Sequence, residues 1–272
     1  MKFLKFNFNF LLPLKVKKMI RMGRDFDGGY IVCADTLKKC KNLISLGVGD
    51  DTSFERDFDK INNSKKIFLY DFSINFGFFF WIILKYLRRL LTFRGSFSSL
   101  TYSIKNFINF KDFISQRNVK LFKEKVVGEI KNENEISLNK IFFRINNEKN
   151  NLLKVDIEGG EYKIIDQVLK HQNKIQMLII EFHWIKKNKK IFQKSVKKLN
   201  KCFQIIHLHA NNYKITRKND EFFDVVEISF INKKNYLYHK KSYRYKFPIF
   251  GLDYECFPDR QKINFSFQKN IK

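Results

Sequence analysis

The chain has 272 residues, enough for one large domain with a full hydrophobic core. Its 53 Lys and Arg exceed its 27 Asp and Glu, giving a formal net charge of +26. The lysines are scattered, and Lys, Asn, Ile and Phe are all abundant, as an AT-rich coding sequence would give, so the charge does not favour a nucleic-acid partner. No Pro-, Gly- or Ser-rich linker divides the chain. We therefore expect a single domain over 1–272, with an insertion at about 75–117.

A tight turn is the first local signal in the chain. Asp27-Gly28-Gly29 can reverse the chain into a short strand at Tyr30-Ile31-Val32. One interpretation is a hairpin that closes one end of a sheet. The other is that Arg21 and Asp27, with the glycine backbone, line the mouth of a cofactor site. The spacing alone does not separate these interpretations.

A glycine loop follows the first strand of an expected α/β sheet. The apolar run 43–46 leads into Gly47 and Gly49, whose backbone can approach a ligand closely. The carboxylates of Asp50-Asp51 directly after them would repel a pyrophosphate and suit a cationic or hydroxyl-rich ligand. The next predicted strand ends at Asp71, about 20 residues further on, where an acid commonly holds ribose hydroxyls. The pattern indicates a nucleoside-type cofactor that need carry no phosphate.

The insertion begins with an almost wholly apolar helix, Phe76–Leu91, that also carries Lys85, Arg88 and Arg89 on one side. Three interpretations are open. The helix can pack on the core, it can cover a bound substrate, or it can lie on a membrane surface as a basic amphipathic helix.

A buried strand over 151–155 ends at Asp156, turns at Gly159-Gly160 and passes into a helix that starts at Glu161. This order places Asp156 and Glu158 at the carboxyl edge of the sheet, where open α/β folds bind ligands. The alternative is that Asp156 and Glu161 only satisfy free N–H groups of the new helix.

Later strands also end in ionisable residues. The strand 175–182 ends beside Glu181 and His183, and the strand 202–213 carries His209 near its polar end. The last clear strand, 224–231, follows a short connection over 214–221, which suggests an antiparallel hairpin with the strand before it.

The order of these motifs resembles the FkbM-type family of S-adenosylmethionine-dependent methyltransferases over nearly the whole chain. The matching stretches are 21–32, 45–55, Tyr70-Asp71, 154–161, 181–183, 209–213 and 226–230. The resemblance implies a class I methyltransferase fold, a mostly parallel seven-stranded sheet with helices on both faces and an antiparallel last strand. Two features depart from the family pattern: the 75–117 insertion, and Asp50-Asp51 where many methyltransferases have a third glycine.

The resemblance also implies roles for individual residues. Gly47 and Gly49 would pass beneath the methionine part of the cofactor, Asp71 would bind its ribose, and Asp156 would lie beside the sulfonium methyl. Glu158 would stand close behind, and Asp51 belongs to the same cofactor loop. Family members mostly O-methylate hydroxyls, so the expected acceptor is a sugar, a glycan or a secondary metabolite.

An alcohol needs a base or a metal before it can accept a methyl group. We expect Asp156, Glu181, His183 and His209 to converge on the acceptor hydroxyl, either as a base cluster or as ligands of one divalent metal. Without a metal, His183 is the expected base.

Two other functions compete with methyl transfer. One is an inactive methyltransferase fold that binds membrane or RNA through its basic surface. The other, a nicotinamide-dependent oxidoreductase, is disfavoured because no G-x-G-x-x-G run is present.

The expected location is the cytoplasm, with peripheral contact to the inner face of the membrane through 76–91 as an option. The four cysteines have no metal-like or C-x-x-C spacing and are expected to be free thiols. Residues 1–14 lack the apolar core and cleavage site of a signal peptide, and no apolar run is long enough to span a bilayer.

Overall fold

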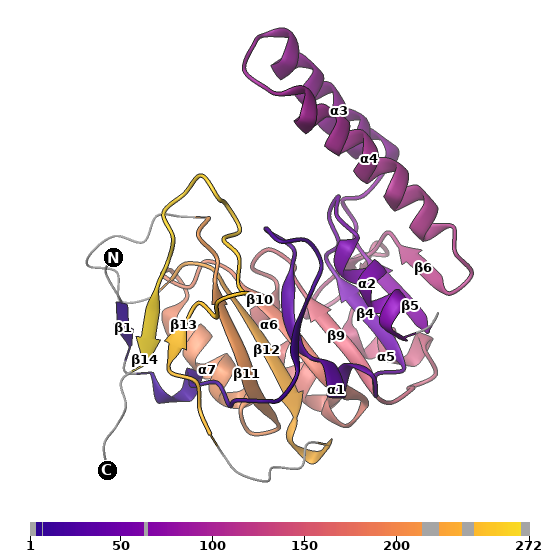
Figure 1. The fold of residues 1–272 in the computed structure, drawn as a ribbon. Coiled ribbons are helices and arrows are strands. Elements are labelled where there is room, and N and C mark those ends of the chain that lie inside the picture. Colours follow the sequence, from indigo (N-terminus) through magenta and orange to yellow (C-terminus); the bar gives the residue numbers. More distant parts are fainter. Residues whose placement is uncertain (1–3, 7, 63–64, 214–222, 236–241, 268–272) are drawn as a thin grey trace.

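The computed structural model describes residues 4–6, 8–62, 65–213, 223–235 and 242–267. Its centre is a seven-stranded sheet in the order β11-β12-β10-β9-β4-β5-β6 (Figure 1). The pairs from β10 to β6 are parallel, whereas β12 is antiparallel to both β10 and β11. The strands are β4 (Asn42–Leu46), β5 (Lys66–Tyr70), β6 (Val119–Phe122), β9 (Asn151–Val155), β10 (Ile175–Phe182), β11 (Phe203–Ala210) and β12 (Val226–Asn232). The predicted class I methyltransferase fold is confirmed.

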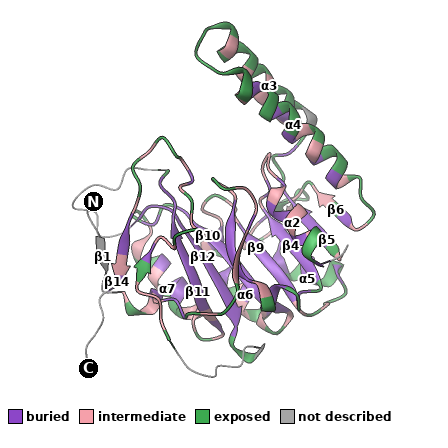
Figure 2. Cartoon of the chain, in the orientation of Figure 1, coloured by how far each residue is buried: buried purple, intermediate pink, exposed green. Residues whose placement is uncertain are grey.

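Both faces of the sheet are covered, which explains why its central strands read as nearly continuous apolar runs. Every residue of β4, β9 and β10 is buried (Figure 2). One core cluster includes side chains of α5 (Leu138–Arg144), α6 (Glu161–Lys170) and α7 (Lys189–Leu199). The cluster on the other face includes α1 (Ala34–Leu37), α2 (Ser53–Asn62), β2 (Met19–Met22) and β3 (Tyr30–Cys33).

The predicted turn at 27–29 connects β2 and β3, which pair as an antiparallel hairpin with Met22 opposite Tyr30. The hairpin lies against the sheet, and the hydroxyl of Ser229 on β12 donates to the carbonyl of Ile31 at 2.6 Å. The hairpin therefore covers part of one face of the sheet instead of closing one end, and Asp27 at its tip lines the cavity described below.

The 75–117 insertion forms two helices, α3 (Phe76–Leu91) and α4 (Phe97–Ile114), that project from the body as a hairpin (Figure 1). Only its base joins the core, through Phe79, Phe110 and Phe113. The interpretation of α3 as a helix packed on the core is therefore wrong beyond its first turn, because α4 is its main neighbour.

Smaller elements cover the edges. A second sheet pairs β1 (Leu4–Phe6), β14 (Phe265–Phe267) and β13 (Lys246–Phe247), while β7 (Lys125–Val126) pairs with β8 (Glu135–Ile136). Short 3-10 turns are η1 (Asn9–Leu11), η2 (Gln172–Lys174) and η3 (Lys233–Asn235). The predicted connection at 214–221 lies outside the described residues. All four cysteines are free thiols, and no helix in the described part of the chain is both long and apolar enough to cross a membrane.

Candidate active site

The loops after β4 and β9 cross at Gly47, which has φ of +79°. A Cβ at this position would lie 1.7 Å from the carbonyl oxygen of Asp156, so only glycine permits the crossing. The backbone N–H of Asp156 donates to the carbonyl of Leu46 at 2.8 Å, which continues the parallel pairing into the loop. The crossing brings the predicted acid at the end of β9 directly against the glycine loop.

A cavity of about 590 Å³ opens at this carboxyl edge of the sheet. Although the chain as a whole is strongly basic, most charged groups on the cavity wall are acids. These acids are Asp27, Asp50, Asp51, Glu55, Asp71, Asp156, Glu158 and Glu181. The cations on the wall are Arg24, Lys154 and His183, the last only when it is protonated. The cavity is therefore suited to a ligand that carries positive charge.

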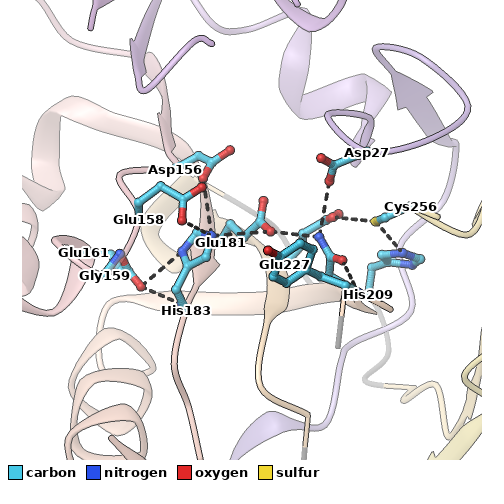
Figure 3. Close-up of polar contacts among 12 residues, drawn as sticks. Asp27, Asp156, Glu158, Gly159, Glu161, Glu181, His183, His209, Glu227 and Cys256 are labelled. Atoms are coloured by element: carbon cyan, nitrogen blue, oxygen red, sulfur yellow. Dashed lines mark hydrogen bonds and ion pairs between the residues drawn. The ribbon is translucent and has the colours of Figure 1, made fainter. Parts of the chain in front are cut away.

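His183 lies at the centre of a group of carboxylates (Figure 3). Its Nε2 is 3.7 Å from an oxygen of each of Asp156, Glu158 and Glu181, and its Nδ1 is 3.5 Å from Oε1 of Glu161. Burial lowers the pKa of His183, but the interactions with Glu161, Glu181 and Asp156 outweigh it and raise the pKa to about 10. His183 is therefore an imidazolium at neutral pH, which weakens its predicted role as the base.

Glu181 has the properties that a base requires. Burial and the charge of Asp156 raise its pKa to about 8, although His183 opposes the shift. Asn211 donates from Nδ2 to Oε1 of Glu181 at 3.0 Å, and the hydroxyl of Tyr30 lies 3.2 Å from Oε2. A carboxylate with a pKa near the working pH both ionises and accepts a proton readily.

Asp71 stands at the end of β5, as predicted, and is bonded to the glycine loop. Its Oδ2 accepts hydrogen bonds from the N–H groups of Val48 at 2.9 Å and Gly49 at 3.0 Å. Its Oδ1 accepts from the N–H and the hydroxyl of Ser73. In this structure the carboxylate therefore holds the loop, and a ribose hydroxyl would have to replace or share one of these bonds.

Asp51 has a local structural role in addition to lining the cavity. Its carboxylate accepts hydrogen bonds from the N–H of Ser53 at 3.0 Å and from the Ser53 hydroxyl at 2.8 Å, at the start of α2. Its Oδ2 is also 3.3 Å from Nε of Arg24, so it links the glycine loop to the β2–β3 hairpin. Asp51 therefore satisfies free groups at the start of α2, a role that the alternative interpretation gave to Asp156 and Glu161 at another helix.

Of the four residues predicted to converge, the structure brings three together and places His209 apart from them. Asp156, Glu181 and His183 come together, whereas His209 lies beside Cys256, at 3.6 Å (Figure 3). Nδ1 of His209 is also 3.4 Å from Oδ1 of Asp253. The physical reason is the sheet order. Because β12 lies between β10 and β11, a residue of β12 separates His209 from the ends of β9 and β10.

Three further residues shape the site without having been predicted for it. Tyr30 places its hydroxyl between Asp156, at 3.1 Å, and Glu181. Buried Lys154 donates to the carbonyl of Gly47 at 2.9 Å and lies 3.7 Å from Glu55. Lys154 could have been found from the sequence, because it is a charged residue inside an apolar strand. A charge buried in this way needs a buried partner. Asn211, which orients Glu181, gave no comparable signal.

One set of ligand atoms in the cavity could hold a metal. Oxygen atoms of Asp156 and Glu158 and a nitrogen of His183 lie within 4.8 Å of one another. This set retains two of the four residues predicted as metal ligands, with Glu158 in place of Glu181 and His209. A divalent cation could bind there only if His183 were neutral. The cation would therefore compete with the proton of His183, which the surrounding carboxylates stabilise.

A sheet in this order, with a glycine loop and an acid-lined cavity at its carboxyl edge, defines a class I methyltransferase fold. The sequence model of the methyltransferase FkbM domain matches residues 33–238, and the chain belongs to this family. Membership supports methyl transfer from S-adenosylmethionine as the activity class. No curated protein gave a significant match.

Solved structures resemble the chain only distantly. One is the precorrin-6y C5,15-methyltransferase from Geobacter metallireducens GS-15, with 14% identity, TM-score 0.37, and coverage of 74% of this chain and 87% of that one. Another is the N-methyltransferase NodS from Bradyrhizobium japonicum WM9, with 8% identity, TM-score 0.35, and coverage of 73% and 92%. Similarity this low carries no information about the substrate.

Proposed function

We propose that this protein transfers the methyl group of S-adenosylmethionine to a hydroxyl of a small molecule, most specifically a sugar, a glycan or a secondary metabolite. The observation that carries the proposal is the position of Glu181, a buried carboxylate with a raised pKa, on the wall of the acid-lined cavity. Methyl transfer to an alcohol needs such a base. The hydroxyl of Tyr30 lies between Glu181 and Asp156.

The acids on the wall fit the charge of this cofactor, whose sulfonium and ammonium groups are both cationic. A second hollow of about 830 Å³ adjoins the first, and both are lined by Gly47, Asp71, Asp156 and Glu158. In the proposed arrangement the cofactor lies across this shared wall. Gly47 and Gly49 would lie beneath its methionine part, and Asp71 would accept a hydrogen bond from its ribose.

In the proposed reaction, S-adenosylmethionine supplies a methyl group that the acceptor oxygen attacks in line with the breaking carbon–sulfur bond. Glu181 accepts the hydroxyl proton of the acceptor. Tyr30 and Asn211 hold the carboxylate of Glu181 in position, because both lie within hydrogen-bond distance of it. His183 stays protonated, and its charge partly offsets the mutual repulsion of Asp156 and Glu181.

The test is to incubate the purified protein with methyl-labelled S-adenosylmethionine and a panel of hydroxylated acceptors, and to measure S-adenosylhomocysteine and labelled product. The proposal predicts label on an acceptor oxygen, and loss of the label when Glu181 is replaced by Gln. Label on nitrogen or carbon would reject O-methylation but keep the methyltransferase class. Failure to bind S-adenosylmethionine would favour the inactive, membrane- or RNA-binding alternative.

A further inference from the structure

A buried row of ionisable residues crosses the sheet next to the proposed active site. Glu227 on β12 is the direct cross-strand neighbour of Glu181 on β10 and of His209 on β11, so the three side chains share one face of the sheet. All three are buried. Cys256, from the C-terminal segment, lies against this row (Figure 3). Its Sγ is 3.6 Å from Nε2 of His209 and 3.6 Å from Oε1 of Glu227.

We propose that His209, Glu227 and Cys256 bind one zinc ion. Their three ligand atoms lie within 4.8 Å of one another. Tetrahedral zinc with bonds of about 2.0–2.3 Å holds a sulfur and a nitrogen or oxygen ligand about 3.5 Å apart. Both distances from the Cys256 sulfur match that spacing. The mixture of thiolate, imidazole and carboxylate is one that zinc accepts.

A carboxylate behind His209 supports the same assignment. Oδ1 of Asp253 lies 3.4 Å from Nδ1 of His209 and 3.0 Å from Nε2 of His207, and the N–H of Ile249 donates to its Oδ2 at 2.6 Å. A proton on Nδ1 of His209, facing Asp253, leaves the lone pair of Nε2 directed at the Cys256 sulfur. Histidines that bind metals are commonly oriented by a carboxylate in this way.

The charge of the group also fits a divalent cation. Glu227, Cys256 and His209 are all buried. As zinc ligands, Cys256 binds as the thiolate and Glu227 as the carboxylate. Zinc, one thiolate, one carboxylate and a neutral imidazole then sum to zero charge, which is the state that a buried site favours. The ion would also link the C-terminal segment to β11 and β12.

Cobalt substitution tests this site directly, because a thiolate bound to Co²⁺ gives an intense near-ultraviolet charge-transfer band. The full-length protein is freed of metal with a chelator and titrated with CoCl₂, then with ZnCl₂. We expect one Co²⁺ per chain with a thiolate band, and displacement of that band by zinc. Cys256→Ala should lose the band, and His209→Ala should weaken cobalt binding at least about tenfold. Cys202→Ala, which removes a free thiol elsewhere, should leave both unchanged.

The cobalt titration of the wild-type protein tests the zinc site even if a variant fails to fold. A wild-type chain that takes up no cobalt, or binds it with no thiolate band, overturns the proposal and leaves a hydrogen-bonded network of Cys256, His209 and Glu227. A band that survives Cys256→Ala also overturns it. The titration is independent of S-adenosylmethionine, so its failure says nothing against the proposed function.

The projecting α3–α4 hairpin carries a separate inference. Along α3, Phe80, Leu84, Leu87 and Leu91 recur at helical spacing, and all four are exposed. The turn between the helices exposes Phe93 almost completely, at 98%. Monomeric proteins seldom leave so continuous an apolar surface uncovered.

Basic residues flank this stripe. Lys85, Arg88, Arg89 and Arg94 lie along α3 and the turn, and the only acid between 75 and 117 is Asp112, near the base of α4. Lys85 lies over the ring of Trp81, 5.2 Å from its centre. This arrangement fits an anionic bilayer, whose acyl region and headgroups meet within a few ångströms. The apolar residues at the tip would contact the acyl region, and the cations around them would contact the headgroups.

From this arrangement we infer that the α3–α4 hairpin inserts its tip into the surface of an anionic membrane. RNA is the less suitable occupant, because three of the four stripe residues are leucines, which offer nothing to phosphates. The site cavity and the hairpin are continuous in the chain, since Asp71 and Ser73 line the cavity and α3 begins at Phe76. Docking would therefore tether the cavity roughly 24 Å from the bilayer, because α3 has 16 residues between its base and the tip.

Vesicle sedimentation tests the docking. The full-length protein should sediment with vesicles of mixed phosphatidylcholine and phosphatidylglycerol and stay in solution with phosphatidylcholine alone. Arg88→Glu with Arg89→Glu should lower the partition coefficient at least about tenfold, and Leu91→Ser with Phe93→Ser should do the same at low salt. The matched control, Lys190→Glu with Lys194→Glu on α7, makes the same charge change away from the hairpin and should have little effect.

Several outcomes would contradict the docking. A wild-type protein that ignores anionic vesicles at low salt overturns it. Equal losses in the hairpin and α7 charge variants would mean that net charge alone drives adsorption. Unchanged sedimentation of the Leu91→Ser and Phe93→Ser protein, together with tight RNA binding that needs Arg88 and Arg89, would assign the hairpin to nucleic acid instead.

Discussion

Oδ2 of Asp71 lies 3.0 Å from the backbone nitrogen of Gly49, and this bond fixes the glycine loop to the end of β5. The same oxygen accepts from Val48, so one carboxylate orders two successive residues of the loop. The proposed ribose ligand and the glycine loop are therefore a single unit, and damage to one is expected to disturb the other.

Asp71→Ala should weaken binding of S-adenosylhomocysteine by about 1.5–3 kcal/mol, because a charged acceptor is lost and the loop is released. Equilibrium binding to the purified variant measures the change. Ser73→Ala removes only one donor to Asp71 and should cost less. Equal affinity in wild type and Asp71→Ala would show that the cofactor does not bind at this loop.

Glu181→Gln should lower kcat by about 10²–10⁴-fold and change the affinity for S-adenosylhomocysteine only a few-fold, since the amide keeps the shape but cannot accept the proton. Steady-state kinetics with an identified acceptor gives both quantities. Exposed Glu133→Gln is the control for the chemical change. Normal turnover in Glu181→Gln, with none in His183→Asn, would return the role of base to His183.

Stability should fall as the pH rises from mildly acidic to alkaline values. The pKa of Glu181 is raised to about 8 and that of His183 to about 10, so the folded protein holds both protons more tightly than the unfolded chain. The stabilisation is complete below the unfolded values of about 4.3 and 6.5, and it is lost as the pH passes the folded values. Thermal melts monitored by circular dichroism should show a falling Tm between pH 6 and 10. Glu181→Gln should flatten the part of the fall below about pH 8, and Glu133→Gln should leave the curve unchanged.

Gly47→Ala should be far more damaging than Gly49→Ala. Both glycines have positive φ, but a Cβ at Gly47 would meet the carbonyl of Asp156, whereas a Cβ at Gly49 would meet nothing within 4 Å. The strain at Gly49 should cost about 1–2 kcal/mol, and the clash at Gly47 should cost more because the two loops must separate. Denaturant melts of the two variants test this order. Similar losses would mean that the loops do not cross as closely as the structure has them.

The sheet could be predicted from sequence because its buried strands are apolar runs that end in recognisable turns. The positions of Gly47, Asp71 and Asp156 at one edge follow from parallel strand order alone. The place of His209 did not follow, because it depends on β12 entering the sheet between β10 and β11. The raised pKa of His183 could not be predicted from the sequence either, since it comes from carboxylates on separate elements.

The cluster around Cys256 shows the same limit. Nothing in the spacing of Cys256, His209 and Glu227 along the chain suggests that they meet. They do so because the C-terminal segment lies over a strand pair whose register sets His209 opposite Glu227. The projection of the α3–α4 hairpin was not predicted, because an apolar helix has the same sequence pattern whether it packs on a core or leaves it.

The central claim is that this cavity binds S-adenosylmethionine, and calorimetric titration of the purified protein with S-adenosylhomocysteine and, separately, with NAD tests it most directly. The account predicts saturable binding of one S-adenosylhomocysteine per chain, weakened in Asp71→Ala, and no binding of NAD. Binding of NAD in preference to S-adenosylhomocysteine, or no binding of either, would contradict it.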